Sequence, residues 1–110
     1  MAAASEQSTP TGPVTESVRL HVAEGANEAF EAAVEEAAPL FRQHGATSFR
    51  LLRQVEQPQH YRLLVGWQRI EDHTETFRNS PAFPAWRALV SPHLVKVPEA
   101  THWTDVLSRV

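Results

Sequence analysis

Apolar residues in this chain switch between two spacings, and the order of the switches constrains the fold more than any other feature. From Val14 to Ala23 apolar and polar residues alternate, as in a β-strand with one buried face. Glu16 falls on the otherwise apolar face of that strand. From Asn27 to Phe41 the apolar residues recur at helical spacing, and Gly45 suits the left-handed end of a helix. The sequence therefore predicts a strand and then a helix, with Asn27 as the helix N-cap.

The remaining pattern predicts two further strands, a split helix and a closing strand. The expected segments are strands at 47–55 and 59–68 around a turn at 56–58, helices at 71–78 and from Ser80 or Pro81 to Val90, and a strand at 100–107. Pro39 is expected to kink or loosen the first helix, and Pro84 to cost a backbone hydrogen bond unless the last helix starts late. The order β-α-β-β-α-β predicts a ferredoxin-like α+β fold, an antiparallel sheet with helices on one face.

Length and composition indicate one small globular domain. The chain has 110 residues, 42% of them hydrophobic and 21% charged, which is enough for one core and one pocket. Residues 1–13 are small and polar and lack a signal-peptide pattern, so they predict a disordered tail before a domain at 14–110. No segment approaches the roughly 18 apolar residues of a membrane span. We therefore expect a cytoplasmic protein without a membrane partner.

Charge and residue content argue against several kinds of site. Ten Lys and Arg against thirteen Asp and Glu give a net charge of −3, so nucleic acid is not an expected partner. The chain has no cysteine, which excludes disulfides and thiolate chemistry. Its six histidines show no metal-binding spacing, its four glycines form no phosphate loop, and no serine lies in a nucleophile elbow. If the protein is an enzyme, it is expected to work without a metal or a nucleotide cofactor.

One face of the predicted sheet is left without helices, which suggests a second copy of the chain. Leu52 and Leu64 fall on that face among Arg19, Arg50 and Arg62. A partner sheet would remove the leucines from water and could pair the arginines. A homodimer is therefore a hypothesis with a physical reason.

His73 is the residue in which the sequence most directly indicates acid–base chemistry. It lies near a predicted helix start between acidic residues, which favour its protonated form, while the helix dipole opposes that form. As a general base it could contribute roughly 10²–10⁴ in rate. The alternative is a surface histidine or a hydrogen-bonded structural one.

Aromatic residues around His73 could form the wall of a pocket or simply the core. Trp67 ends a strand, and its indole N–H needs a partner when buried. Phe77, Phe83 and Trp86 have spacings compatible with one apolar wall. Arg87 follows Trp86 and could hold an anionic oxygen, or it could be a solvated helix arginine.

Taken together, these residues resemble the antibiotic biosynthesis monooxygenase (ABM) domain. The resemblance is carried by Trp67, by the segment EDHTETFRNSPAFPAWR at 71–87, and by the start VTESVRLHVAEGANEAF at 14–30, and it extends over about residues 14–106. It implies an ABM-like domain at 14–110 that forms a dimeric α+β barrel, with a cavity between sheet and helices in each protomer. The same superfamily holds polyketide cyclases, isomerases and haem-degrading enzymes, so it implies fold more specifically than reaction.

The resemblance implies a particular set of site residues for one branch of the family. Cofactor-independent anthrone and quinol oxygenases use a tryptophan and an asparagine on the third strand, a tyrosine on the next helix and an arginine on the following one. Trp67 and Arg87 match the tryptophan and the arginine, whereas Leu63 and His73 stand at the asparagine and tyrosine positions. Losing the asparagine removes an oxyanion donor. A histidine in place of tyrosine supplies a better base near neutral pH.

The haem-degrading branch fits less well. It requires an asparagine, a tryptophan and an iron-ligating histidine, where this chain has Val18, Phe77 and Arg87. Three hypotheses remain. The first is a cofactor-independent monooxygenase for a small reduced aromatic (a quinol or an anthrone-like molecule), with His73 as base, Trp67 and Arg87 as anion stabilisers, and Leu63, Phe77, Phe83 and Trp86 lining the substrate. The second is an isomerase or cyclase on the same scaffold. The third is a non-enzymatic dimer that binds a hydrophobic ligand, with its aromatic residues packed on one another.

Overall fold

Four strands and their connecting helices follow one another in the predicted order. The computed structural model describes residues 13–109. Its elements are β1 (Val14–His21), α1 (Asn27–Arg42), β2 (Ala46–Arg53), β3 (His60–Trp67), the π-helical segment η2 (Asp72–Phe77), α2 (Ala82–Val90), the short 3₁₀ helix η3 (Ser91–His93) and β4 (Glu99–Trp103). The strands form one sheet in the order β2-β3-β1-β4, and every neighbouring pair is antiparallel. The ferredoxin-like prediction is confirmed.

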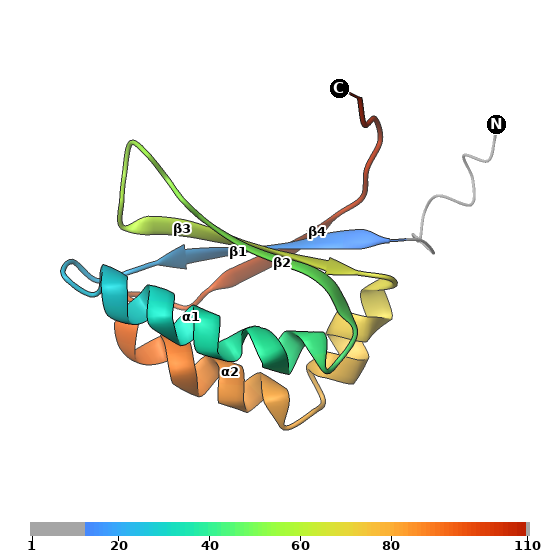
Figure 1. Cartoon of the computed structure of the whole chain (residues 1–110), viewed down its shortest axis with the longest axis horizontal. Helices are drawn as coiled ribbons and strands as arrows, with labels where there is room; N and C mark the ends of the chain where they lie inside the picture. The colour runs from blue at the N-terminus through green and yellow to red at the C-terminus, as the bar shows by residue number, and fades with distance from the viewer. Residues whose placement is uncertain (1–12, 110) are drawn as a thin grey trace.

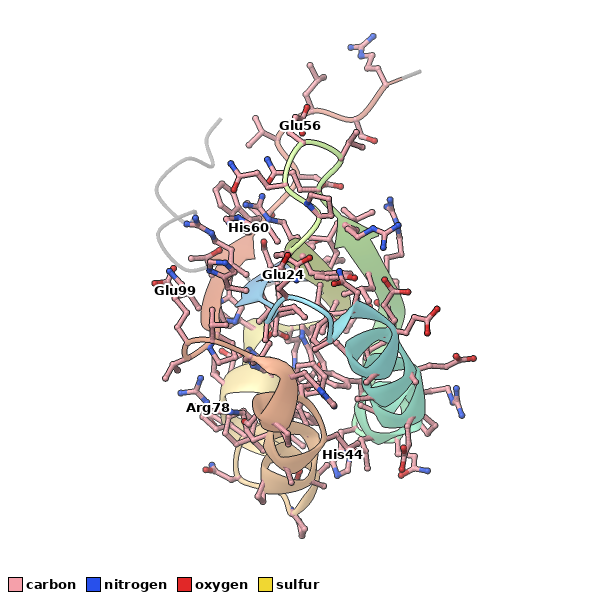
Figure 2. All side chains as sticks on the ribbon, turned by 90° about the vertical axis from the view of Figure 1, so that its left-hand side faces the viewer. Glu24, His44, Glu56, His60, Arg78 and Glu99 are labelled. Carbon is pink, nitrogen blue, oxygen red and sulfur yellow. The ribbon has the colours of Figure 1, made fainter. Side chains whose placement is uncertain are left out.

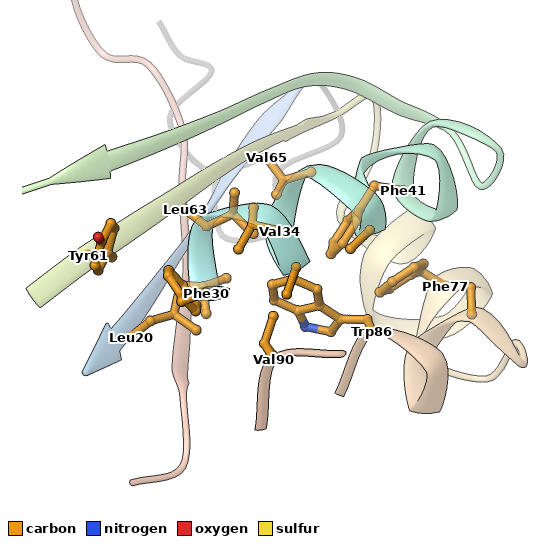
Figure 3. Close-up of a cluster of buried hydrophobic side chains, with 14 of the residues drawn as sticks. Leu20, Phe30, Val34, Phe41, Tyr61, Leu63, Val65, Phe77, Trp86 and Val90 are labelled. Carbon is orange, nitrogen blue, oxygen red and sulfur yellow. The ribbon is translucent and has the colours of Figure 1, made fainter. Parts of the chain in front are cut away.

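The helices cover one face of the sheet and enclose the core (Figure 1). Alternate residues of β1 and β3 point toward them, including Val18, Leu20, Leu63 and Val65, all at most 4% exposed. Apolar side chains of α1 and α2 fill the space between the layers (Figure 3). The period-two and helical stripes of the sequence thus meet in a single core.

Strand register brings β1 and β4, the first and last strands, together beside this core. Glu16 in β1 lies opposite Val65 in β3 on one side and opposite His102 in β4 on the other. Residues opposite each other in antiparallel strands share a face of the sheet. Glu16 and His102 therefore both face the helices.

Two local expectations are corrected by the structure. Asn27 is the first residue of α1 rather than its N-cap, which is Ala26. The Asn27 side chain instead donates hydrogen bonds to the Pro58 carbonyl and the Tyr61 hydroxyl, both at 2.9 Å. The closing strand is β4 at Glu99–Trp103, shorter than predicted.

Neither Pro39 nor Pro84 ends its helix. α1 continues past Pro39 to Arg42. α2 starts at Ala82, whose backbone N–H donates to Ser80 Oγ at 3.2 Å. Pro84 therefore lies in the first turn, where a backbone N–H has no partner within the helix, and costs no hydrogen bond.

The other face of the sheet has no helix over it. The turn between β2 and β3, marked by Glu56 in Figure 2, and the segment after β4 both extend beyond this face, away from the helices (Figures 1 and 2). Leu52 is 38% exposed there and Leu64 is partly buried. Within residues 13–109 no helix is long and apolar enough to cross a membrane. The predicted disordered tail lies outside the described residues except for Pro13, and the cytoplasmic location stays a prediction.

Candidate functional site

A buried carboxylate lies at the centre of the most unusual polar cluster in the molecule. The Glu16 side chain is only 5% exposed. Trp67 Nε1 donates a hydrogen bond to Glu16 Oε1 at 3.0 Å. His73 Nε2 lies 3.1 Å from the other oxygen, Oε2. Both carboxylate oxygens therefore have a side-chain nitrogen close by, and neither nitrogen belongs to a lysine or an arginine.

The cluster continues from His73 to the edge of the sheet. His73 Nδ1 lies 2.7 Å from His102 Nε2, within hydrogen-bond distance. His73 is 2% exposed, whereas His102, on the edge strand β4, is only partly buried. Glu16, His73 and His102 thus form a row of close polar contacts from the core toward the surface. We call these three residues the Glu-His-His chain.

Burial sets the protonation states of the three residues of the Glu-His-His chain. It raises the pKa of Glu16 from 4.5 to about 7, against the lowering effects of the Trp67 hydrogen bond and the charge of Arg78. It lowers the pKa of His73 from 6.5 to about 4, and the charges of His102 and Arg78 act in the same direction. The pKa of His102 is lowered by burial and by Arg78. Near neutral pH both imidazoles are therefore neutral and Glu16 is close to its own titration point.

The wide turn of η2 directs His73 inward. The Arg78 N–H donates to the His73 carbonyl at 3.1 Å, an i to i−5 bond that belongs to a π-helix. Single π turns are frequent at functional sites because the extra residue changes the direction of side chains. Here the His73 ring lies nearly parallel to that of Trp67, with centroids 5.7 Å apart and an interplanar angle of 19°.

The structure brings together some of the residues predicted to line a pocket. Phe77 lies 5.7 Å from Trp67, 6.2 Å from His73 and 6.0 Å from Phe83, measured between ring centroids. Phe41, which the sequence reasoning placed only in the core, stacks on Phe77 at 4.6 Å (Figure 3). The centre of this group is packed aromatic surface.

The other predicted lining residues lie deeper or farther away. The Trp86 ring meets Phe41 edge-on at 5.0 Å and is 4% exposed, and Leu63 is fully buried in β3. The Arg87 guanidinium lies over the Phe83 ring at 5.9 Å. Its Nε is buried and, within the described part of the chain, has no hydrogen-bond partner. Phe83 therefore links Arg87 to the cluster.

The two described hollows lie away from His73. The larger, about 520 Å³, is on the uncovered face of the sheet near the β2–β3 turn, and Arg19, Arg62 and Lys96 are among its lining residues. The smaller, about 230 Å³, is lined by Arg87 and the segment after η3. Neither of these two hollows is lined by His73.

Two members of the Glu-His-His chain were not selected as site residues from the sequence. Glu16 had a signal, because a carboxylate on an apolar strand face needs partners when buried. His102 had none, since its position beside Glu16 depends on the register of β4 against β1. Among residues 13–109 no group of three or more His, Cys, Asp or Glu side chains is arranged to hold a metal ion. The ring nitrogens of His73 point to Glu16 and His102 instead of converging on one point.

Comparisons with known proteins agree with this fold. Residues 13–89 match the family described as antibiotic biosynthesis monooxygenase. The chain is 37% identical over 94 residues to the Bacillus subtilis protein YczJ, which is uncharacterised, covering 84% of this chain and 99% of that one. A crystal structure of a proposed antibiotic biosynthesis monooxygenase from Bordetella bronchiseptica is 36% identical with a TM-score of 0.84, covering 87% of this chain and 99% of the other.

A more distant structure shares the fold. SnoaB from Streptomyces nogalater, a cofactor-independent oxygenase, is 20% identical with a TM-score of 0.76, covering 88% of this chain and 96% of SnoaB. At that identity the likeness concerns the fold alone. Because residues 13–89 match the family and two relatives exceed 30% identity, the chain belongs to the antibiotic biosynthesis monooxygenase family.

Proposed function

We propose that the protein is a cofactor-independent monooxygenase that oxidises a small reduced aromatic, a quinol or an anthrone-like molecule, with O₂. A base removes a proton from the substrate, and the resulting anion gives its electrons to O₂. At the methylene carbon of an anthrone, or of the keto tautomer of a quinol, one oxygen atom stays on the carbon as a carbonyl, and the other leaves as water with the two hydrogens lost by that carbon. The substrate itself supplies all the electrons, so no external reductant is needed.

The observation that carries this proposal is the buried Glu-His-His chain. A general base must be unprotonated at the working pH and must be held in a fixed orientation. The lowered pKa of His73 meets the first condition, and its close contacts with Glu16 at 3.1 Å and His102 at 2.7 Å support the second. Membership of a family that contains oxygenases supports the same chemistry.

The other predicted site residues take distinct roles in this proposal. Trp67 holds Glu16 through its indole N–H and so positions the base. Arg87, whose Nε is buried without a partner within the described residues, remains our candidate for stabilising the substrate anion. Phe77 and Phe83 supply apolar surface for an aromatic ring, and Leu63 and Trp86 form the support behind them.

Oxygen uptake with a panel of quinols and anthrones tests the proposal. His73→Ala should lower the rate by about 10²–10⁴, the usual contribution of a general base. Trp67→Phe should lower it less, because the carboxylate stays in place. His60→Ala is the matched control, since His60 lies on the uncovered face. Uptake that is indifferent to both His73→Ala and Trp67→Phe would remove the residue assignment.

A second candidate is favoured by the packing of the aromatic cluster. Trp67, Phe77 and Trp86 are at most 4% exposed and all contact Phe41. A non-enzymatic dimer that binds a hydrophobic ligand accounts for such a filled core, and it predicts no turnover of any substrate. An isomerase or cyclase on the same scaffold would instead turn over its substrate without oxygen. Assays under anaerobic conditions separate these alternatives from the monooxygenase.

We also propose that the protein is a homodimer paired through the uncovered face of the sheet. Exposed apolar side chains lie on this face and on the two segments that extend beyond it: Leu52 at 38%, Val55 at 89%, Trp103 at 60%, Val106 at 93% and Leu107 at 75% exposure. A second copy would remove this surface from water.

Light scattering coupled to gel filtration tests the dimer. Leu52→Asp should shift the protein toward monomer, because it places a carboxylate in the proposed interface. Ala32→Asp, on the exposed side of α1, is the control and should leave the mass unchanged. A wild-type protein that elutes as a monomer would contradict the proposal.

A further inference from the structure

The two short contacts of the Glu-His-His chain, 3.1 Å from His73 Nε2 to Glu16 Oε2 and 2.7 Å from His73 Nδ1 to His102 Nε2, can be filled by hydrogens in two complete and opposite arrangements. When Glu16 is ionised, its oxygens accept from Trp67 Nε1–H and from His73 Nε2–H. His73 Nδ1 then has no hydrogen and accepts from His102 Nε2–H, so that His102 Nδ1 is left as a bare lone pair.

The second arrangement has every hydrogen bond of the chain reversed. When Glu16 is protonated on Oε2, that hydroxyl donates to His73 Nε2. His73 then carries its hydrogen on Nδ1 and donates to His102 Nε2, and the hydrogen of His102 is on Nδ1. The two arrangements differ by one proton overall, and neither contains a charged histidine.

We propose that Glu16, His73 and His102 form a proton relay in which a proton accepted at His102 Nδ1 is stored on the buried carboxyl group of Glu16. The transfer is a shift of three hydrogens. The incoming proton bonds to His102 Nδ1, the His102 Nε2 hydrogen passes to His73 Nδ1, and the His73 Nε2 hydrogen passes to Glu16 Oε2. Three N–H or O–H bonds form and two N–H bonds break within the chain, and the third broken bond is that of the proton donor.

The surroundings favour storage on the carboxylate rather than on a histidine. In many histidine–carboxylate pairs the carboxylate stays ionised and the imidazole takes the charge. Here burial acts on all three groups in the opposite sense, raising the pKa of Glu16 and lowering those of His73 and His102. Arg78 is the one charged side chain of the described residues that shifts all three pKa values, and it disfavours a cationic histidine.

The relay refines the role of His73 in the proposed function: His102 takes the proton directly from the donor, and His73 passes a proton on to Glu16. This assignment rests on the proposed function, because in turnover the donor is the reduced aromatic substrate. The partial exposure of His102 on the edge strand agrees with that position, whereas His73 has both ring nitrogens occupied. Glu16 and His73 then act through His102 as positioning and proton-accepting groups.

Nitrogen NMR of the histidine rings in the whole protein tests the relay without any substrate. In wild type both His73 and His102 should carry hydrogen on Nε2 above about pH 8 and on Nδ1 below about pH 6, with the change centred near the pKa of Glu16. Assignments come from His73→Gln and His102→Gln. His44 is an internal control, because its Nδ1 donates to the Leu40 carbonyl at 2.8 Å and keeps that hydrogen throughout.

Glu16→Gln sharpens the test. Trp67 Nε1–H keeps the amide oxygen of this glutamine on its own side, so the amide nitrogen faces His73 Nε2 and can only donate to it. Both histidines should therefore show the Nδ1–H form from about pH 6 to about pH 8. If His102 instead becomes doubly protonated at low pH while His73 keeps its Nε2 hydrogen, the proton stays at the surface and the relay is wrong. The wild-type titration decides the question even where Glu16→Gln does not fold.

Oxygen uptake distinguishes failure of the relay from failure of the proposed function. With both correct, His102→Gln should lower the rate about as much as His73→Ala, and the rate should rise with pH through the pKa of Glu16, near 7. A tautomer switch without oxygen uptake would remove the function and leave the relay. Uptake with fixed tautomers, or uptake unaffected by His102→Gln, would remove the relay and leave the function.

Discussion

Two glutamates at opposite ends of the core use the same functional group in different ways. Glu31 on α1 accepts hydrogen bonds from the Tyr61 hydroxyl at 2.5 Å and from Arg53 at 3.3 Å, and its side chain is 43% exposed. Glu16 on β1 also accepts an aromatic side-chain donor, Trp67, but it is 5% exposed and its second partner is a neutral histidine.

The difference in surroundings explains why Glu16 is suited to exchange a proton. Water and the Arg53 guanidinium offset the cost of keeping the Glu31 carboxylate charged. Glu16 has neither, so its ionised and neutral forms are close in free energy near neutral pH. The first glutamate ties α1 to the sheet, whereas the second forms the inner end of a switchable chain.

The largest expected effect is a pH dependence of stability that belongs to Glu16. The pKa of Glu16 rises from 4.5 to about 7 on folding, so the folded state holds this proton more tightly than the unfolded chain. The resulting stabilisation is fully present below pH 4.5 and is lost as the pH rises through 7. By linkage this amounts to about 3 kcal/mol at most.

Urea unfolding of wild type, Glu16→Gln and Glu31→Gln at about pH 5 and pH 8 measures this effect. Wild type and Glu31→Gln should lose stability over this range relative to Glu16→Gln. His73 acts in the opposite direction, because its pKa falls from 6.5 to about 4 on folding and its contribution is lost as the pH falls through that range. The contribution of Glu16 is therefore read from the difference in unfolding free energy between wild type and Glu16→Gln at each pH. Parallel curves for all three proteins would contradict the assignment.

Trp67→Phe should produce the next largest effect. It removes the indole N–H that donates to Glu16 and leaves a small void, at a cost of about 1–3 kcal/mol. The loss should be greater at about pH 8 than at about pH 5, because the ionised carboxylate depends more on this donor. A pH-independent loss would indicate that packing alone is affected.

Sequence reasoning recovered the parts of this architecture that depend on local pattern. The apolar stripes of β1, α1 and β3 predicted the sheet, the covering helices and the core because each is a periodicity within one element. Local pattern also predicted Asn27 as a helix cap, which was wrong. The hydrogen bonds of its side chain to the Pro58 carbonyl and the Tyr61 hydroxyl join residues far apart in the sequence, and local pattern does not show them.

The candidate site was only partly predictable for a related reason. His73 and Trp67 were identified from one short segment, but the partner of both is Glu16, which in sequence is 51 residues from Trp67. His102 joins them only through the pairing of β4 with β1. The π turn that directs His73 inward has no known residue signature in Asp72–Phe77. The pairing of strands far apart in the sequence therefore places Glu16 and His102 beside His73, and local sequence pattern does not predict that pairing.

Tyr61→Phe should have a smaller effect than Trp67→Phe, although both remove one donor to a glutamate. The Tyr61 hydroxyl donates to Glu31 and accepts from Asn27, but water can replace it at both partners. The expected loss is about 0.5–1.5 kcal/mol, with little change between about pH 5 and pH 8. The same urea unfolding measures this loss. If Tyr61→Phe lost as much unfolding free energy as Trp67→Phe, the greater exposure of Glu31 would not make it less dependent on its donor than Glu16.

Arg53→Ala should have the smallest effect, although it removes the only ion pair of Glu31 among the described residues. The nitrogen–oxygen distance is 3.3 Å, and the two side chains are 54% and 43% exposed. Exposed pairs of this kind contribute about 0–1 kcal/mol, and salt weakens them further. The difference between wild type and Arg53→Ala should therefore shrink as sodium chloride is added during unfolding. A loss above about 2 kcal/mol that persists in salt would show that Glu31, like Glu16, depends on its partners because water does not reach it.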